Sequence, residues 1–175
     1  MTGKAVLLTI MPHASQRIDF WIEPLNEAMD TFDVNTSLRR AAFLAQIAHE
    51  SGELNFIKEI WGPTEAQKGY EGRTDLGNTE IGDGSKFRGR GLIQITGRNN
   101  YRLVGNALGL PLLFHPEMLE LPQYAAMSAA WFWEIHGLNI LADAGDFKAI
   151  TKKINGGYNG FVQRKEFYER AKAVL

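Results

Sequence analysis

The stretch "LRRAAFLAQIAHES", from Leu38 to Ser51, predicts a long and closely packed helix. Its apolar side chains recur at helical spacing and fall on one side: Leu38, Ala41, Ala42, Ala45 and Ala48. Small alanine side chains suit the close approach of a neighbouring helix. The preceding "NTS" at 35–37 offers capping side chains, and Gly52 marks the expected end, because glycine readily adopts the conformation that follows a helix.

Further helices are expected on both sides of this stretch. A four-three repeat of apolar residues predicts a helix over 18–32, either kinked or restarted at Pro24. The later helices expected from apolar runs and capping residues are Ala125–Ile135, one from Asp146 to Gly156-Gly157, and a last one capped by Asn159.

The middle of the chain is rich in glycine, since residues 52–109 hold 12 of the 18 glycines. Glycine at this density indicates turns and close backbone approaches, and only Leu92–Thr96 is expected to form a short strand. A long loop region inside a compact domain is usually functional. The sequence therefore predicts a single catalytic domain over 1–175, in the mainly α (α+β) class, with helices framing a loop-rich cleft.

The composition excludes several kinds of protein. The 175-residue chain is 45% hydrophobic and 22% charged, which is typical of a globular domain. A net charge of -1 gives no basic footprint for nucleic acid, and the absence of cysteine excludes disulfides and zinc–thiolate sites. No apolar run is long enough to span a membrane. The opening "KAVLLTIMP" lacks the cleavage site of a signal peptide, so synthesis in the cytoplasm is expected.

Glu50 is the first candidate for chemistry, because it lies in the last turn of the predicted helix. Phe43, Ile47 and Glu50 fall on one stripe of that helix. The negative end of the helix dipole and apolar neighbours both favour the protonated carboxylic acid. This is the form that a general acid needs. The ordinary alternative is a solvated glutamate near a helix end.

Glu59 follows nine residues later, beyond the expected stop at Gly52, and can therefore lie on a separate wall of a cleft. Two carboxylates several ångströms apart, with a water between them, are the equipment of an inverting glycosidase. Spacing alone leaves three rivals for the second carboxylate: Glu53, Glu65 and Glu71.

The histidines do not indicate a metal site, whereas some aromatic residues are candidates for sugar contacts. "HESGE" at 49–53 has glutamate where a zinc-protease motif needs its second histidine, and no metal site is expected. Four aromatic residues fall in the glycine-rich part: Trp61, Tyr70, Phe87 and Tyr101. Aromatic faces beside amide side chains are typical of carbohydrate contacts, whereas core packing explains any one of them equally well.

Three blocks of the sequence resemble glycoside hydrolase family 19, the chitinase family that also includes many phage and prophage endolysins. The blocks are "FLAQIAHESGEL", "GDGSKFRGRGLIQITGRNNY" and "KKINGGYNGFVQRKEFY", in the order of the family. "YEGRTDLGNT" and "SAAWFWEIHGLN" resemble its compact bacterial and phage branch, so the resemblance covers nearly the whole chain. The family implies a mostly helical, lysozyme-like fold with a deep cleft.

The resemblance also implies roles for individual residues. Glu50 matches the family's general acid, Glu59 matches the base that activates water, and Thr96 matches a hydroxyl that helps to hold this water. The positions that match or are expected to join the substrate contacts are Gln94, Asn100, Asn155, Tyr70 and Tyr101. Arg164 matches an arginine near the base, which it is expected to orient.

One departure from the family pattern bears on the substrate. Where many chitinases read Tyr-Tyr-Gly-Arg-Gly, this chain has Arg88 in place of the second tyrosine. A cation at the rim of a cleft suits an anionic glycan, and peptidoglycan carries carboxylates. Arg88 is therefore expected to contact substrate, although a neighbouring acid could pair with it instead.

Together these residues predict a monomeric endolysin of the muramidase type, without metal or cofactor. It would cut β-1,4 bonds in the peptidoglycan glycan strand, with no nucleic-acid partner, no separate wall-binding module and no stable membrane anchoring. It would be made in the host cytoplasm and reach the periplasmic wall through a membrane pore. The alternatives are a chitinase that acts on chitin oligomers and a non-catalytic glycan-binding module.

Overall fold

The computed structural model describes residues 1–175 as ten α-helices and four short 3-10 helices, joined by loops. The α-helices are α1 (Lys4–Ile10), α2 (Ile22–Thr31), α3 (Ser37–Glu50), α4 (Glu65–Lys68), α5 (Asp83–Lys86), α6 (Arg98–Leu108), α7 (Pro122–Ile135), α8 (Leu138–Asp143), α9 (Phe147–Asn155) and α10 (Phe161–Val174). The 3-10 helices are Pro12–Ala14, Ile18–Phe20, Thr74–Leu76 and Pro116–Glu120. The expected mainly α class is confirmed.

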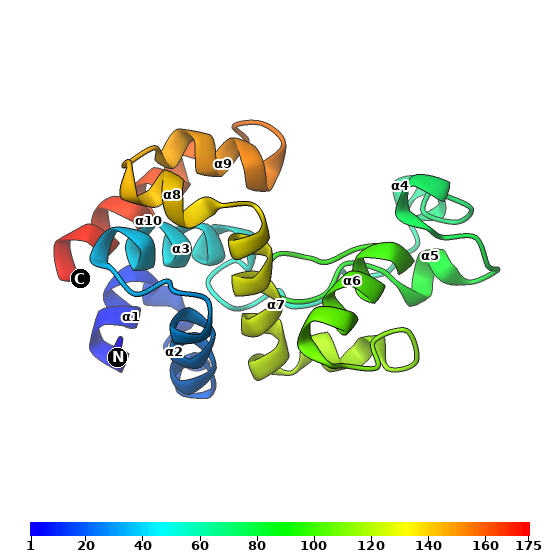
Figure 1. Ribbon diagram of the computed structural model, residues 1–175, viewed down its shortest axis with the longest axis horizontal. Helices are drawn as coiled ribbons and strands as arrows, with labels where there is room; N and C mark the ends of the chain where they lie inside the picture. Colours follow the sequence, from blue (N-terminus) through cyan, green and yellow to red (C-terminus); the bar gives the residue numbers. More distant parts are fainter.

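The helices form two unequal parts (Figure 1). Residues 1–55 and 122–175, with α1–α3 and α7–α10, are called the helical lobe, and residues 56–121, with α4–α6, are called the loop lobe. In the helical lobe, α3 packs chiefly against α10, while α7 packs against α2 and also reaches α6 of the loop lobe. Both chain ends lie in the helical lobe.

The central position of α3 follows from its composition. Every residue from Ala41 to Ala48 is buried, so the helix is enclosed on nearly all sides. The hydroxyl of Thr36 caps its first turn by accepting a hydrogen bond from the backbone N–H of Arg39 (3.2 Å). The chain leaves the helix at Ser51 and turns at Gly52, whose φ is +55°. The predicted helix, cap and stop are confirmed.

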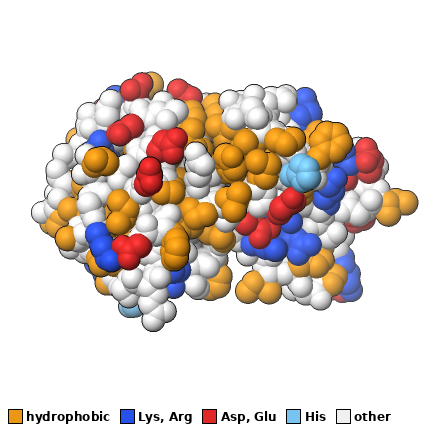
Figure 2. Space-filling view, turned by 90° about the horizontal axis from the view of Figure 1, so that it is seen from below, with side chains coloured by type: hydrophobic (Ala, Val, Ile, Leu, Met, Phe, Trp, Pro, Cys, Tyr) orange, Lys and Arg blue, Asp and Glu red, His pale blue; other side chains and the backbone are white.

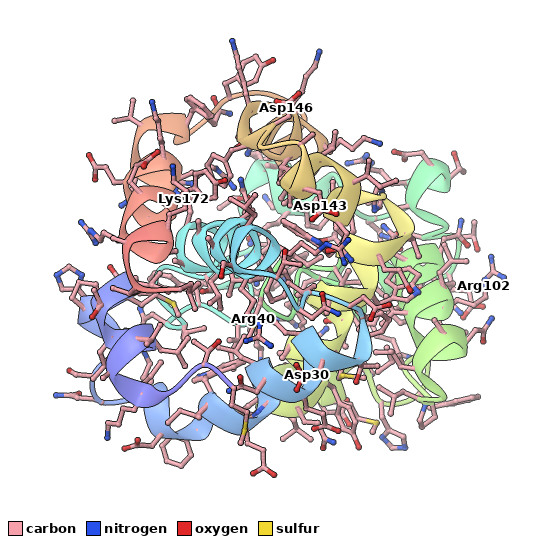
Figure 3. The ribbon with its side chains drawn as sticks, turned by 60° about the vertical axis from the view of Figure 1, so that its left-hand side comes forward. Asp30, Arg40, Arg102, Asp143, Asp146 and Lys172 are labelled. Carbon is pink, nitrogen blue, oxygen red and sulfur yellow. The ribbon has the colours of Figure 1, made fainter.

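Ion pairs on the outside of the helical lobe join α3 to its neighbours. Figure 3 shows Asp30 of α2 beside Arg40 of α3, an ion pair of 3.3 Å. Arg39 also donates to Asp143 of α8 at 2.8 Å. Because exposed pairs contribute only about 0–1 kcal/mol, the packing of α3 rests mainly on its buried apolar faces.

Two predicted helix starts had different outcomes. Asp146 caps α9 as expected, accepting a hydrogen bond from the backbone N–H of Ala149 (2.9 Å). The expectation for Asn159 is wrong, because α10 starts after Gly160 and has no side-chain cap. At Pro24, the expected restart of the helix is found to within two residues. The helix α2 starts at Ile22 and has the proline in its first turn, where no backbone N–H donor is needed.

The molecule has one large core and one small one. The large core fills the helical lobe, and the small core consists of six buried residues of the loop lobe: Phe87, Ile95, Tyr101, Val104, Leu112 and Leu119. Trp131 of α7 packs against both cores and therefore links the two lobes. Hydrophobic side chains also form a band over the middle of the face shown in Figure 2.

The short strand expected over Leu92–Thr96 is not present. The backbone groups of Arg90 and Ile95 exchange two hydrogen bonds (3.1 and 2.8 Å), and the intervening residues form a tight turn. Gln94 has a φ of +57°, in the left-handed region that strand residues do not occupy. The apolar run "LIQI" therefore lies in a folded-back turn, in which Arg90 pairs with Ile95 on one side and with Lys58 on the other.

Candidate active site

Glu50 lies at the C-terminal end of α3, in the helical lobe, and is paired with an arginine of α10. Its Oε1 is buried and lies 2.5 Å from Nη2 of Arg164, so that the two side chains form an ion pair without a well-aligned hydrogen bond. The side chain is 21% exposed, although Oε1 itself is buried. The fold brings a guanidinium from the last helix against this carboxylate, a charged neighbour that the local sequence around Glu50 did not indicate.

Arg164 is itself held by a buried polar network. Its guanidinium donates to Oε1 of Gln46 (2.5 Å) and to the carbonyl of Asn159 (3.1 Å). Gln46 in turn donates to the hydroxyl of Thr151 (2.9 Å). The side chains of Arg164, Gln46 and Thr151 are all almost completely buried. Buried hydrogen bonds of this kind hold the guanidinium in one geometry. Arg164 therefore orients Glu50, and the expectation that it orients the second acid, Glu59, is wrong.

His49 completes the surroundings of Glu50 and was not identified from the sequence. Its Nδ1 lies 2.7 Å from Oε1 of Gln163, and its ring packs against Gly160 so closely that a Cβ atom there would have no room. Burial, followed by the charge of Arg164, lowers the pKa of His49 below its ordinary value. The side chain of His49 is therefore neutral near pH 7 and does not add a second positive charge beside Glu50.

Glu59 lies in the loop lobe, on the segment that leads from α3 to α4. Its carboxylate accepts hydrogen bonds from the amide of Gln67 (3.0 Å), the hydroxyl of Tyr70 (3.4 Å) and the backbone N–H of Gly89 (3.1 Å). All three donors are neutral. Burial, followed by the charge of Glu59, raises the pKa of Tyr70, which keeps its phenol protonated as a donor. The arrangement suits a carboxylate that accepts a proton from water.

Gln67 connects Glu59 to the start of α4. Thr64 and Gln67 form a reciprocal capping box, in which each side chain accepts a hydrogen bond from the other residue's backbone N–H. The same Gln67 amide donates to Glu59 and to the carbonyl of Ile60 (2.7 Å). The sequence pattern of a threonine followed three residues later by glutamine could have identified this cap, but not its contact with Glu59.

Gly89 brings the turn at 90–95 against Glu59. A Cβ atom at this position would lie 2.6 Å from Oε1 of Gln94 and 3.3 Å from the hydroxyl of Thr96. Both side chains therefore lie beside the backbone that donates to Glu59. Gln94 and Thr96 thus lie on the same side of the chain, and the turn at 90–95, rather than an extended strand, brings them there.

Trp61 and Arg88 form a small shelf next to the Glu59 side of the site. The guanidinium of Arg88 lies 5.0 Å from the centre of the Trp61 ring, and Trp61 is 6.1 Å from the ring of Tyr70. Arg88 donates through Nε to the carbonyl of Ser85 (2.7 Å) and takes part in no ion pair. The possible pairing of Arg88 with a neighbouring acid is therefore not found.

Two of the other expected contacts lie near the surface, and one does not. Asn100, in the first turn of α6, is exposed and donates to the carbonyl of Thr96 (2.7 Å). Asn155 ends α9 in the helical lobe and accepts a hydrogen bond from the backbone of Asn159 (3.2 Å). Tyr101 is completely buried, and burial raises the pKa of Tyr101 to about 12. The expectation that Tyr101 contacts substrate is wrong. Its hydroxyl donates to the carbonyl of Arg88 and accepts from the guanidinium of Arg90 inside the small core.

The rival glutamates all have structural partners. Glu53 accepts hydrogen bonds from the backbone and ring of His13 (2.8 and 2.6 Å) and is only 8% exposed. Glu71 accepts from the backbone of Gly82 and Gly84 (2.6 and 2.9 Å), and Glu65 pairs with Lys68 on the surface. These contacts leave Glu50 and Glu59 as the pair whose carboxylates adjoin the predicted sugar-contacting residues.

The structure contains no group of three or more His, Cys, Asp or Glu side chains that could hold a metal ion. None of its helices is long and apolar enough to cross a membrane.

Comparisons with known proteins give the family. Residues 26–139 match the glycoside hydrolase family 19 profile described as "Chitinase class I". A glycosyl hydrolase family 19 domain-containing protein of Haemophilus influenzae is 30% identical over 200 residues, covering 96% of this chain and 94% of that protein. An endochitinase of Arabidopsis thaliana is 43% identical over 120 residues, which are 67% of this chain and 38% of the plant protein. This chain belongs to glycoside hydrolase family 19.

Solved structures show the same fold. Chitinase C of Streptomyces griseus superposes with a TM-score of 0.78 at 24% identity, covering 99% of this chain and 76% of that one. A second bacterial family 19 chitinase gives a TM-score of 0.76 at 24% identity and covers 99% and 94% of the two chains. The lysozyme-like helical fold expected from the sequence is therefore confirmed. The chain is a glycoside hydrolase, related to chitinases.

Proposed function

We propose that this enzyme hydrolyses β-1,4 bonds between N-acetylated amino sugars with inversion at the anomeric carbon. The observation that carries the proposal is the contrast between the two carboxyl groups. Glu50 is held through one oxygen by Arg164 and leaves the other free, which suits protonation of the departing oxygen. Glu59 meets only neutral donors, which suits removal of a proton from water beside Thr96. An inverting mechanism requires an acid and a base on opposite sides of the scissile bond, and the two glutamates come from different lobes.

The stereochemistry of the product tests this mechanism. N-acetylglucosamine oligomers are digested, and the first product is followed by proton NMR before mutarotation. Inversion of a β bond yields the α-anomer first. A β-anomer, or full activity in a Glu50→Gln variant, would refute the assigned roles. Circular dichroism of the variant checks that the loss of the negative partner of Arg164 has not unfolded the helical lobe.

N-acetylglucosamine polymers of the chitin type are the favoured substrate. The Arabidopsis relative is named an endochitinase and the Streptomyces structure is that of a chitinase, and chitin is the simplest polymer that the same two carboxylates could cut. This ranking reverses the order reached from the sequence, where peptidoglycan came first.

Peptidoglycan stays the second candidate because of Arg88. Its guanidinium stacks on Trp61 close to Glu59 and has no carboxylate partner within the protein. A lactyl or peptide carboxylate of peptidoglycan could pair with it, whereas chitin offers no negative group. A peptidoglycan substrate would also fit an endolysin.

Parallel digestion separates the two substrates. Release of soluble sugar is measured from colloidal chitin and from purified peptidoglycan with the wild type, with Arg88→Gln and with Arg102→Gln. Arg102 is a matched control, because it points into solvent from α6 (Figure 3). If peptidoglycan is a substrate, Arg88→Gln lowers its digestion several-fold and leaves chitin digestion nearly unchanged. Wild-type activity on chitin alone would rule out the peptidoglycan candidate.

A further inference from the structure

Lys58 and Arg90 lie directly opposite each other in an antiparallel bridge that joins the segment of Glu59 to the turn at 90–95. A backbone hydrogen bond from the N–H of Glu59 to the carbonyl of Gly89 (2.8 Å) flanks this bridge. Residues directly opposite in an antiparallel pair carry their side chains close together on the same face. Two cations therefore face each other one position away from the candidate base.

Glu120, the last residue of the 3-10 helix Pro116–Glu120, contacts both of these cations. Its Oε2 accepts a hydrogen bond from Nζ of Lys58 (3.1 Å), and its Oε1 accepts one from Nε of Arg90 (2.7 Å). Like charges directly opposite each other on paired strands are destabilising. Because the side chain of Arg90 is only 7% exposed, water and salt screen its charge little. Glu120 therefore supplies the negative charge that allows the bridge to close.

Arg90 also connects this bridge to the small core. Its Nη1 donates to the carbonyl of Lys86 (2.8 Å) and to the hydroxyl of Tyr101 (3.0 Å). Its backbone pairs with Ile95 at the other end of the turn. Hydrogen bonds inside a low-dielectric interior hold their partners firmly. The arginine that Glu120 neutralises is thus the common support of the bridge and of the turn at 90–95.

The closed bridge in turn holds the carboxylate of Glu59. The backbone of Gly89 accepts from the N–H of Glu59 and also donates its own N–H to Oε2 of the same residue (3.1 Å). The carboxylate of Glu120 contacts Lys58 and Arg90 and makes no hydrogen bond to Glu59. Any influence of Glu120 on the base therefore passes through the two paired backbone segments.

We propose that Glu120 is a positioning residue for the general base. By neutralising Lys58 and Arg90 together, it keeps the bridge closed and the N–H of Gly89 on the carboxylate of Glu59. The proposal rests on the proposed function, in which Glu59 is the base. Without the charge of Glu120 the two cations repel each other, the bridge loosens, and the base loses its alignment with the attacking water.

Glu120→Gln provides the first test, with kinetics on the N-acetylglucosamine hexamer. Because a misplacement of about 1 Å can cost about 10²-fold in rate, kcat should fall by about ten- to a hundredfold, while KM changes by less than about twofold. Glu117→Gln is the matched control, since Glu117 lies on the same 3-10 helix and pairs with His115 at the surface. A wild-type kcat in Glu120→Gln, or a change in KM alone, would overturn the proposal.

A second-site variant tests whether charge is the cause. In Lys58→Gln/Glu120→Gln the facing cations are gone, so kcat should recover most of what Glu120→Gln loses. Glu120→Asp keeps the charge but has a side chain too short to reach both cations, and its kcat should lie between those of the wild type and Glu120→Gln. A double variant as slow as Glu120→Gln would refute the role of charge neutralisation.

The amide NMR signal of Gly89 gives a readout that needs no activity. A hydrogen bond to a carboxylate moves an amide proton downfield, so Glu120→Gln should move this signal upfield, in the direction set by Glu59→Ala, which removes the acceptor. An unmoved signal would contradict the proposal. If the wild type cleaves no oligomer but the signal moves as expected, the positioning role stands and the assignment of Glu59 as base fails. Thermal unfolding checks each variant, and Glu120→Asp takes the place of Glu120→Gln if the latter does not fold.

Discussion

The two lobes hold their carboxylates in different ways. In the helical lobe, Glu50 is the last residue of a buried helix and pairs with Arg164, which a buried network fixes in turn. In the loop lobe, Glu59 lies on an irregular segment and is held by an amide, a phenol and one backbone N–H. Because Glu50 has a charged partner, its carboxylate contributes to the stability of the helical lobe. Glu59 has only neutral donors, so its carboxylate contributes less to the stability of the loop lobe. Substitutions can therefore separate chemistry from stability more cleanly at Glu59 than at Glu50.

The largest expected effect is that of Glu59→Gln. Removing a general base typically lowers kcat by about 10²–10⁴-fold, and glutamine keeps most of the volume. Because the partners of Glu59 are neutral, the free energy of unfolding should change little, whereas Glu50→Gln should lower it by leaving Arg164 without its negative partner. Steady-state kinetics and urea unfolding of both variants measure this difference. Equal destabilisation by the two substitutions would remove the distinction between the lobes.

Gln46→Leu tests the network behind Glu50. The substitution removes the acceptor of Arg164 and the donor to Thr151 inside the core, and unpaired buried groups cost about 1–3 kcal/mol each. The free energy of unfolding should fall accordingly, and kcat should fall because Glu50 loses its orientation. Urea unfolding and kinetics measure the two effects, with Gln123→Leu on the exposed side of α7 as the control. A Gln46→Leu enzyme with wild-type stability would show that the network holds nothing.

Asp83→Asn tests how the loop lobe stays folded as the pH falls. Hydrogen bonds from Arg98 hold the pKa of Asp83 below its ordinary value. The lowered pKa stabilises the fold above the ordinary aspartate pKa of about 4, and the contribution is lost as the pH falls through the lower folded value. Asp83→Asn should therefore cost about 1–2 kcal/mol at neutral pH, the difference between a charged and a neutral hydrogen bond.

This cost should shrink below about pH 4, which urea unfolding over a pH series measures. Asp75 is the matched control, because Arg73 also lowers its pKa but the pair is exposed to water. Asp75→Asn should change the stability much less. A loss for Asp83→Asn that is independent of pH would mean that packing, and not the charge, is responsible.

The smallest effects are expected at two helix caps, one in each lobe. Thr36→Ala and Thr64→Ala each remove a capping hydroxyl, typically worth about 1 kcal/mol. Thr36→Ala should lower only the stability. Thr64→Ala should also lower kcat, because it loosens Gln67, which contacts Glu59. Thermal unfolding and kinetics of both variants are the measurements. Identical kcat values would show that the cap of α4 does not influence the base, Glu59.

The sequence predicted the helical lobe better than the loop lobe for a physical reason. A helix such as α3 is encoded by apolar spacing and by caps that act within a few residues, and both are visible in one stretch of sequence. The turn at 90–95 depends on pairing between Arg90, Ile95 and Lys58, and on a left-handed Gln94. No local pattern distinguishes that turn from a short strand of the same apolar residues.

The sequence by itself determined the helical class, the place of Glu50 at the end of a buried helix, and the resemblance that led to family 19. Only the tertiary structure decided what each candidate residue contacts. It placed Arg164 against Glu50 and Gln46, the latter 118 positions away in the chain, and it buried Tyr101 inside the small core. Local periodicity reflects neighbours three or four residues apart, whereas these contacts depend on which helix faces pack together, and that is settled only when the whole chain has folded.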